Sequence, residues 1–420
     1  MLNINILGSF SEHMTARVFQ GLGWGAFETL VLSSIQDTYF EHERPTKIAF
    51  YHVVATATTW GPPLLGGVAS SGPNGFTTQF KIIGSFLSVA ILLLVFGAPE
   101  TTFDRSNFYP PMPATARAES EARWPRVAFT KDAAQTYLAK MKPWSYRAES
   151  IHLRLVMQAP RALIAPTTIL LFVATLLPYV GLWSLASSLS LLFSPMPFML
   201  TESALGVLMT GPFLLTTAVA AATILALTFV FKRYTSAIHV AIIATGTAIA
   251  SIGVFGFGLY IKGIMQIPAG SDVDSATPWT LGYLGDQLSF PVVSLLLGLL
   301  GAGSLMLDAT IRPTIQRSTA FTSSSLQVGL RNTADMNGGL ACLRNLAAGV
   351  FVLGVPNAVW SWDGLKAAAV GMGAAQIAIA AAVCAVWWFC DEHVKRWDGR
   401  AMGLVDLSLL KRQVSFFDTT

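Results

Sequence analysis

Charged residues are scarce in this sequence of 420 residues, where Asp, Glu, Lys and Arg together make up 12% of the chain. A soluble protein carries roughly twice that share, because polar groups must cover its surface. Hydrophobic residues account for 53% of the chain, and the mean hydropathy is +0.55. The scarcity of charge therefore argues against a soluble globular protein and indicates a protein embedded in a membrane.

Sequence motifs of enzymes and metal sites are also missing. There is no His-Glu-x-x-His, no Gly-x-Ser-x-Gly and no phosphate-binding loop. Three cysteines, Cys342, Cys384 and Cys390, show no metal-binding spacing, and we expect them to be buried as small apolar side chains. We therefore predict no enzyme activity, no cofactor and no metal, with a membrane-embedded enzyme as the weaker alternative.

The basic excess does not indicate a nucleic-acid partner. The formal net charge is +4 and the pI is about 9.0, but the basic residues lie between long apolar runs rather than on one solvated face. The partner that these runs predict is the lipid bilayer. A helix crosses a bilayer with about 20 apolar residues, and the short alternating segments of a membrane barrel are absent from the sequence.

The apolar runs predict nine membrane-spanning helices in an all-α integral membrane protein. The first is the most polar, because it contains Arg17, Gln20 and Glu28, and the eighth contains Arg344, which we expect near a membrane surface or inside the bundle. The predicted spans are residues 15–36, 48–70, 80–98, 162–193, 204–231, 236–261, 288–307, 337–359 and 364–390.

Basic residues are concentrated in alternate connections between these spans. Residues 101–161 hold ten Lys or Arg against five Asp or Glu, whereas Ser194–Ser203 holds no Lys or Arg. Because positively charged loops remain in the cytoplasm, residues 101–161 and the C-terminal tail are predicted to be cytoplasmic. Residues 101–161 also divide the chain, either as an ordinary long loop or as the linker between two helical bundles. We adopt the second division: a three-span bundle (1–100), a linker (101–161), a six-span bundle (162–390) and a tail (391–420).

Ionisable residues in the first predicted span are candidates for proton coupling. In one continuous helix, Arg17 and Glu28 would lie within about 20° of the same direction, with Gly21 on the same stripe. Ionisable groups inside a span commonly line an aqueous path or a proton relay. The alternative is that both residues are structural and lie near the two membrane surfaces.

Four segments in the first 101 residues resemble motifs of the major facilitator superfamily, in the order that the family has them. Two of them contain the residues to which the resemblance gives a role: Arg17 and Gln20 in a motif associated with proton coupling, and a Gly-Pro-rich segment that resembles the antiporter motif, although it has Pro62 where the family has glycine. The four segments are Arg17–Gly23, Asp37–Arg44, Thr58–Gly67 and Pro99–Thr101. The antiporter-motif candidates are Gly61, Pro62, Pro63, Gly66 and Gly67.

The resemblance implies a two-lobed bundle and secondary transport of a small organic molecule. The details are most similar to the drug:proton antiporter branch of filamentous fungi, which implies proton-coupled export at the plasma membrane. It also implies that the first span here is the family's fourth, so that the N-terminal lobe is incomplete. The alternatives are a facilitator or symporter for sugar-like nutrients, and a truncated relic that does not transport.

Two aromatic residues in the fourth predicted span are candidates for a substrate cavity. Tyr179 and Trp183 lie one turn apart and follow Pro178, which interrupts the helix. The alternative is that both rings face lipid. At the end of the seventh span, Asp308 is predicted to pair with Arg312, four residues further on.

Overall fold

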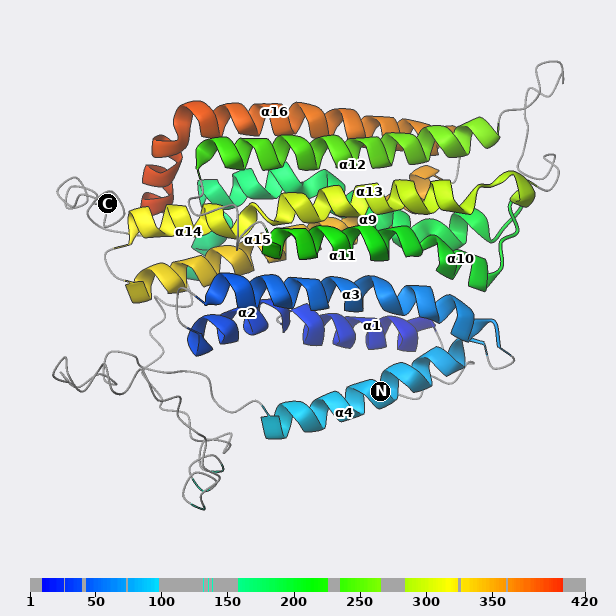
Figure 1. The fold of residues 1–420 in the computed structure, drawn as a ribbon, viewed down its shortest axis with the longest axis horizontal. Coiled ribbons are helices and arrows are strands. Elements are labelled where there is room, and N and C mark those ends of the chain that lie inside the picture. The colour runs from blue at the N-terminus through cyan, green and yellow to red at the C-terminus, as the bar shows by residue number, and fades with distance from the viewer. Residues whose placement is uncertain are drawn as a thin grey trace. The chain divides into compact units, whose positions relative to one another are not determined.

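The computed structural model describes most of the predicted helices and few of the connections between them. The described residues are 10–25, 27–39, 43–72, 75–97, 131, 135, 138, 158–225, 235–265, 284–323, 326–359 and 362–402. Most of the predicted linker, the Pro99–Thr101 segment and the tail beyond residue 402 lie outside these residues. Within them the chain forms helices and no strand (Figure 1).

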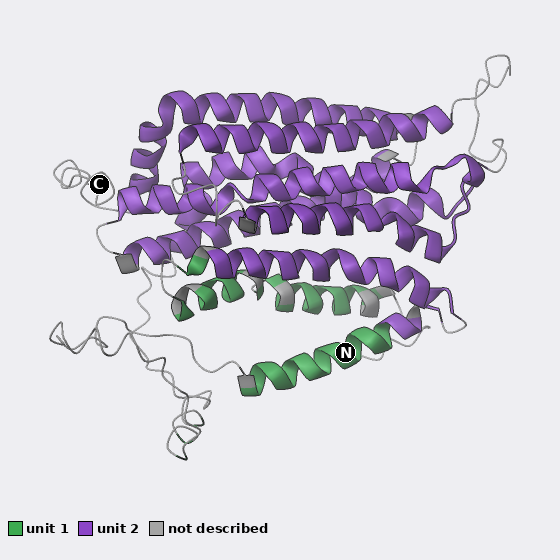
Figure 2. Cartoon of the chain, in the orientation of Figure 1, with its two compact units in different colours: residues 1–44, 80–152 green, residues 45–79, 153–420 purple. Residues whose placement is uncertain are grey.

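The chain divides into two compact units, which Figure 2 distinguishes by colour. Unit 1 comprises residues 1–44 and 80–152. Its helices are α1 (Phe10–Gly25), α2 (Phe27–Thr38) and most of α4 (Phe76–Gly97). The guanidinium Nε of Arg44 donates a hydrogen bond to the carbonyl of Tyr39 at 3.0 Å, just beyond the end of α2. The first predicted span, residues 15–36, falls on α1 and α2, with residue 26 between them outside the described residues.

Unit 2 comprises residues 45–79 and 153–420 and holds nearly all of the helix with the antiporter-like segment Thr58–Gly67 together with the C-terminal helices. The structure thus groups residues 45–79 with the C-terminal bundle. The helices of this unit are α3 (Arg44–Ser70), α8 (Gln158–Leu163), α9 (Pro166–Phe193), α10 (Glu202–Leu208), α11 (Thr210–Leu225), α12 (Ser236–Ile264), the 3-10 turn η4 (Gly285–Gln287), α13 (Phe290–Asp308), α14 (Ile311–Thr322), α15 (Leu326–Val359) and α16 (Trp362–Ala401).

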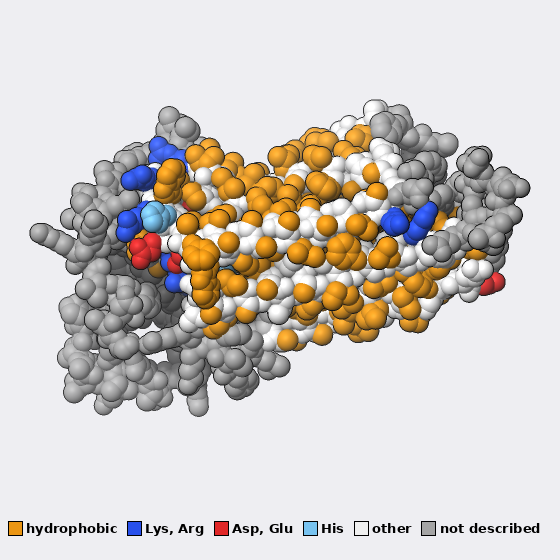
Figure 3. Space-filling view, turned by 90° about the horizontal axis from the view of Figure 1, so that it is seen from above, with side chains coloured by type: hydrophobic (Ala, Val, Ile, Leu, Met, Phe, Trp, Pro, Cys, Tyr) orange, Lys and Arg blue, Asp and Glu red, His pale blue; other side chains and the backbone are white. Residues whose placement is uncertain are grey.

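Seven helical segments among the described residues are long and apolar enough to cross a membrane, so the chain is a multi-pass α-helical membrane protein. They correspond to the third to ninth predicted spans. The predicted spans 15–36 and 48–70 are helical but more polar, and they are not among the seven. On the face drawn in Figure 3, hydrophobic side chains cover the middle and charged side chains gather toward the two ends. The seven segments are Thr77–Phe96, Pro166–Phe193, Glu202–Thr223, Ser236–Ile264, Phe290–Thr322, Val328–Ala358 and Gly364–Ala401.

The core of unit 2 has two hydrophobic clusters, both built around α9, α12 and α13. The first contains Phe193, Phe198 and Phe257, and the second contains Leu171 and Ile315. Lipid supplies no hydrophobic force between helices, so their association depends on close packing, which small residues allow. A Cβ at Gly253 of α12 would lie only 2.4 Å from the backbone nitrogen of Leu300 on α13.

Helix α9 contains a proline whose missing N–H is compensated by another helix. Pro178 cannot donate to the carbonyl of Ala174, four residues earlier. The side-chain amide of Gln376 on α16 donates to that carbonyl at 2.8 Å, and Gln376 is almost fully buried. The break in the hydrogen-bond ladder of α9 is therefore closed from α16.

The start of α9, α14 and the last part of α16 are joined by one buried carboxylate. α16 has non-helical backbone angles at Cys390, where the predicted last span ends, and the segment beyond it turns away from the main axis (Figure 1). Asp398 in this segment accepts hydrogen bonds from the backbone N–H and hydroxyl of Thr167 and from the hydroxyl of Ser318. Since Ala165 at the N-cap of α9 has no side-chain acceptor, Asp398 caps α9 from another helix.

The three cysteines are free, and the expectation that all are buried is wrong. Cys342 and Cys390 are exposed on the protein surface, and Cys384 is half-buried. In a membrane protein the lipid-facing surface is apolar, so a small apolar side chain gains no advantage from burial.

Candidate functional site

The proton-coupling candidates of the first predicted span lie in unit 1. Arg17 is exposed on α1, and its guanidinium donates a hydrogen bond to the side-chain oxygen of Gln20 at 3.3 Å. Glu28 belongs to α2, and its side chain is outside the described residues. The common stripe for Arg17 and Glu28 assumed one continuous helix, and this stays a prediction because residue 26, between α1 and α2, lies outside the described residues. Their role in proton coupling stays a prediction.

The antiporter-motif candidates lie on α3 and meet the C-terminal helices through glycines. A Cβ at Gly67 would lie 2.6 Å from the carbonyl oxygen of Glu202 and 2.7 Å from the Cα of Gly206 on α10. The backbones of α3 and α10 are therefore in direct contact. Gly66 faces the side chain of Gln79, whose amide donates to the Gly66 carbonyl.

The remaining motif residues, Gly61, Pro62 and Pro63, lie on the same helix. A Cβ at Gly61 would meet the Phe213 ring at 3.5 Å, an ordinary contact distance. Pro62 and Pro63 lie inside the helix without ending it. α3 is closely packed at Gly67, where the contact with α10 leaves no room for a side chain.

The substrate-cavity candidates form part of an aromatic row that extends to α3. The rings of Tyr179 and Trp183 on α9 make an edge contact at 6.3 Å between centroids. Trp183 is stacked on Trp60 of α3 at 5.5 Å, with 27° between the ring planes. Trp60 is buried, whereas Trp183 is 37% exposed. The row therefore joins the antiporter-like segment to the middle of α9.

An ion pair lies at the other end of this row. The guanidinium of Arg344, near the middle of α15, is 3.9 Å from the centroid of the Tyr179 ring and 2.7 Å from the carboxylate of Asp308 at the end of α13. The Tyr179 hydroxyl donates to the side-chain oxygen of Asn345 at 3.0 Å. Attraction between a cation and an aromatic face adds to the ion pair and fixes the guanidinium plane. Arg344 is buried inside the bundle, one of its two predicted positions.

We call Trp60, Trp183, Tyr179, Arg344 and Asp308 the aromatic–ion-pair cluster. It draws side chains from α3, α9, α13 and α15, all in unit 2. It combines apolar ring surface with one buried cation and one partly exposed anion. Such a mixture is typical of ligand sites, in which apolar walls carry a few oriented polar groups.

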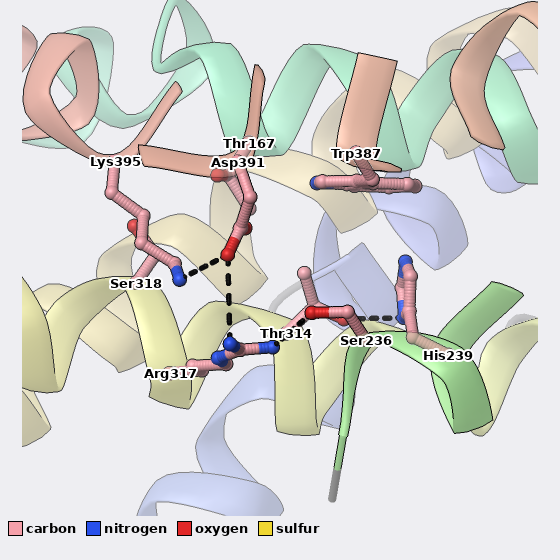
Figure 4. Close-up of a pocket in the computed structure, with 9 residues that line it drawn as sticks. All are labelled: Thr167, Ser236, His239, Thr314, Arg317, Ser318, Trp387, Asp391 and Lys395. Carbon is pink, nitrogen blue, oxygen red and sulfur yellow. Dashed lines mark hydrogen bonds and ion pairs between the residues drawn. The ribbon is translucent and has the colours of Figure 1, made fainter. Parts of the chain in front are cut away.

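A second group of polar residues lies around a small cavity between α12, α14 and α16. Asp391 pairs with Arg317 at 3.5 Å and with Lys395 at 2.5 Å, and the His239 ring lies against Thr314 and Trp387 (Figure 4). The cavity volume is about 20 Å³, which is room for about one water molecule. These residues tie helix ends together and leave no space for an organic substrate. Among the described residues, no group of three potential metal ligands is close enough to hold an ion.

The sequence singled out some residues of the cluster, and it gave no link between most of them. It named Tyr179 and Trp183 as candidates for a substrate cavity and placed Arg344 either near a membrane surface or inside the bundle, and it considered only Arg312 as a partner for Asp308. Arg344 itself was the missed signal for this ion pair, because a cation inside a span requires an anion from another helix. Trp60 lies in the antiporter-like segment Thr58–Gly67, and nothing in the sequence linked it to Trp183.

One comparison with known proteins bears on this arrangement. The chain is 32% identical over 97 residues to an uncharacterised MFS-type transporter of Schizosaccharomyces pombe, where MFS denotes the major facilitator superfamily. The match covers 23% of this chain and 16% of that protein, so it spans about a sixth of the relative's length. No family model and no solved structure matches the chain. The fold defines a multi-pass α-helical membrane protein, and this chain has partial similarity to an MFS-type transporter.

Proposed function

We propose that the protein is a secondary active transporter that moves a small organic molecule across a membrane in exchange for protons, in the direction of export. The observation that carries this proposal is the aromatic–ion-pair cluster. It lies near the middle of α9 and α15, and transporters bind their substrates at mid-membrane, between helices that change their packing.

The contact between α3 and α10 supports the proposal from a second direction. Transport requires a helix contact that can open and close without a large change in buried side chains. A glycine-to-glycine contact such as that of Gly67 and Gly206 has few interlocked side chains to release. The partial similarity to an MFS-type transporter is consistent with the same activity.

In this proposal, proton coupling depends on the first predicted span. Arg17 does not release a proton itself, because a guanidinium stays charged in proteins. It would bias the protonation of a neighbouring acid or water, with Gln20 orienting it and Glu28 as a candidate acid. The protein would act as a multi-pass protein of the plasma membrane, with residues 101–161 and the C-terminus on the cytoplasmic side.

The test is transport by the purified protein in proton-tight lipid vesicles. A pH gradient is imposed, and the accumulation of a panel of aromatic organic compounds is followed. The proposal expects saturable accumulation that stops when the gradient is collapsed by a protonophore. Compound movement that is identical in empty vesicles and in protein-containing vesicles would contradict it.

A further inference from the structure

A small cavity lies beside the proline break of α9, between α9, α12, α13 and α16. Its volume is about 10 Å³, which is at the lower limit for one water molecule, about 10–15 Å³. Pro178 forms part of its wall, together with apolar side chains from all four helices. Two of the lining side chains are polar, Ser251 on α12 and Gln376 on α16. The cavity is therefore too small for an organic ligand, and two helices present polar groups to it.

Both polar side chains are almost fully buried, and each has an oxygen that makes no hydrogen bond among the described residues. Ser251 is 4% exposed and Gln376 is 2% exposed. The two oxygens are the hydroxyl Oγ of Ser251 and the amide Oε1 of Gln376. A buried polar atom without a partner is destabilising, and folded proteins satisfy nearly all such atoms, often with an ordered water. Each oxygen therefore needs a partner that no side chain of the described helices supplies.

The orientation of the Gln376 amide is fixed by its nitrogen. Nε2 donates to the Ala174 carbonyl at 2.8 Å and to the Thr247 hydroxyl at 3.4 Å. A carbonyl can only accept, so the amide cannot exchange the places of its nitrogen and oxygen. Thr247 and Ser251 lie one turn apart on α12 and so share the face that meets Gln376. Oε1 is thus a fixed acceptor at a cavity that the Ser251 hydroxyl also lines.

The chemistry of the lining favours a neutral occupant. No charged side chain is among the described residues that line the cavity, so an ion would be buried there without an opposite charge. Oε1 of Gln376 requires a donor, whereas the Ser251 hydroxyl can both donate and accept. A water molecule supplies a donor and an acceptor at once, and its size matches the cavity.

We propose that this cavity binds one ordered water molecule, which bridges Ser251 of α12 and Gln376 of α16 beside the proline break of α9. The water satisfies the oxygen of the Gln376 amide while the nitrogen of the same amide satisfies Ala174. One amide then joins three helices, and the water holds it in the orientation that the proline break requires. This inference goes beyond the proposed function and does not depend on transport.

Hydroxyl-radical labelling with X-rays tests for the bound water, because the radicals form from water and oxidise the side chains beside it. Met372 lines the cavity and is the reporter. Met306 on α13 is the control, since it is also half-buried in a span but does not line the cavity. In the purified protein, mass spectrometry should show several-fold faster oxidation of Met372 than of Met306. Equal rates, or a faster rate at Met306, would overturn the inference.

Removal of one polar group should release the water. Ser251→Ala leaves one polar side chain at the cavity, too few to retain a water molecule. Oxidation of Met372 should then fall to the rate of Met306, whose own rate should not change. Ser187→Ala is the matched control, because the Ser187 hydroxyl donates to the Ser184 carbonyl of its own helix and lies outside the cavity. An unchanged Met372 rate in Ser251→Ala would show that this serine holds no water.

The stability of the same variants gives a second test with a defined sign. If the water is bound, Ser251→Ala should raise the equilibrium constant of unfolding about tenfold, as the loss of one hydrogen bond does. The same substitution should have little effect in the Gln376→Leu background, where the water has already lost a partner. If no water is bound, Ser251→Ala removes an unsatisfied buried hydroxyl and should stabilise the protein. Stabilisation, or equal destabilisation in both backgrounds, would overturn the inference, as would coupling of the two residues without oxidation of Met372.

Discussion

The side-chain amide of Gln376 on α16 donates a 2.8 Å hydrogen bond to the carbonyl of Ala174 on α9, the carbonyl that Pro178 leaves without its helical donor. Gln376 also lies 3.4 Å from the hydroxyl of Thr247 on α12. Gln376 thus links α16 to α9 and α12, and the carbonyl that it satisfies lies five residues before Tyr179, where the aromatic–ion-pair cluster begins. A side chain on α16 thus stabilises the backbone that positions the candidate site.

A double-mutant cycle tests this relationship. Gln376→Leu should destabilise the protein by about 1–3 kcal/mol, because the Ala174 carbonyl would be buried without a donor. In the Pro178→Ala background the helix supplies its own N–H, and the same substitution should cost much less. Unfolding of the four proteins in one detergent gives the coupling energy. Equal costs of Gln376→Leu in both backgrounds would show that the amide does not serve the proline break.

The glycines of the antiporter-like segment are expected to differ in their tolerance of a methyl group. At Gly67 a Cβ meets the backbone of α10 at 2.6 Å, whereas at Gly61 it meets a ring carbon of Phe213 at 3.5 Å. Gly67→Ala should therefore destabilise the protein by about 1–3 kcal/mol, the usual cost of overpacking, and Gly61→Ala should have little effect. Thermal unfolding of the matched pair measures the difference. A larger loss at Gly61 than at Gly67 would contradict the contact between α3 and α10.

Removal of the Asp398 carboxylate should loosen the start of α9. Asp398 is buried and accepts bonds from Thr167 and Ser318, so Asp398→Ala should cost about 2–3 kcal/mol. Hydrogen exchange should become faster in the first turn of α9. Glu392→Ala is the control, because Glu392 is exposed and pairs across one turn with Arg396, an arrangement worth less than about 0.5 kcal/mol. The capping role is refuted if both variants exchange alike in this turn.

The predicted orientation is open to chemical labelling in intact cells. The free cysteines Cys342, Cys384 and Cys390 are first replaced, and single cysteines are then introduced. A membrane-impermeant reagent should modify a thiol at Ser275 and leave thiols at Ser106 and Ser415 unmodified, because the basic connections remain in the cytoplasm. Labelling of the thiols introduced at Ser106 and Ser415 in unbroken cells would contradict the predicted orientation.

Helices with long apolar runs were predictable, because a helix that crosses a membrane needs about 20 mostly apolar residues. The predicted spans 236–261 and 288–307 agree with α12 and α13 to within three residues at each end. α15 was predicted to start at residue 337 but begins at Leu326. Its first turns contain Asn332 and Thr333, which are polar yet buried against α14, where Thr319 and Thr333 share a 2.7 Å hydrogen bond.

The candidate site was less predictable, because its decisive contacts join distant parts of the chain. Spacing along a helix suggested Arg312 as a partner for Asp308, and the ion pair of Asp308 with Arg344 on another helix was not foreseen. The stacking of Trp60 on Trp183 depends on how α3 packs against α9, which hydropathy and motifs do not encode. The helix α14 was missed for a related reason, since it is polar on one face and lies between two spans.

The most direct test of the account is whether gradient-driven transport depends on the aromatic–ion-pair cluster. Accumulation of the panel of aromatic organic compounds in proton-tight vesicles is measured for wild-type protein, Arg344→Gln and Arg396→Gln, the last an exposed arginine of α16 outside the cluster. We expect transport by wild type and Arg396→Gln, and a loss of about tenfold or more in Arg344→Gln at equal protein content, matching the loss of a charged contact. Equal transport by all three proteins would contradict the assignment of the cluster as the transport site.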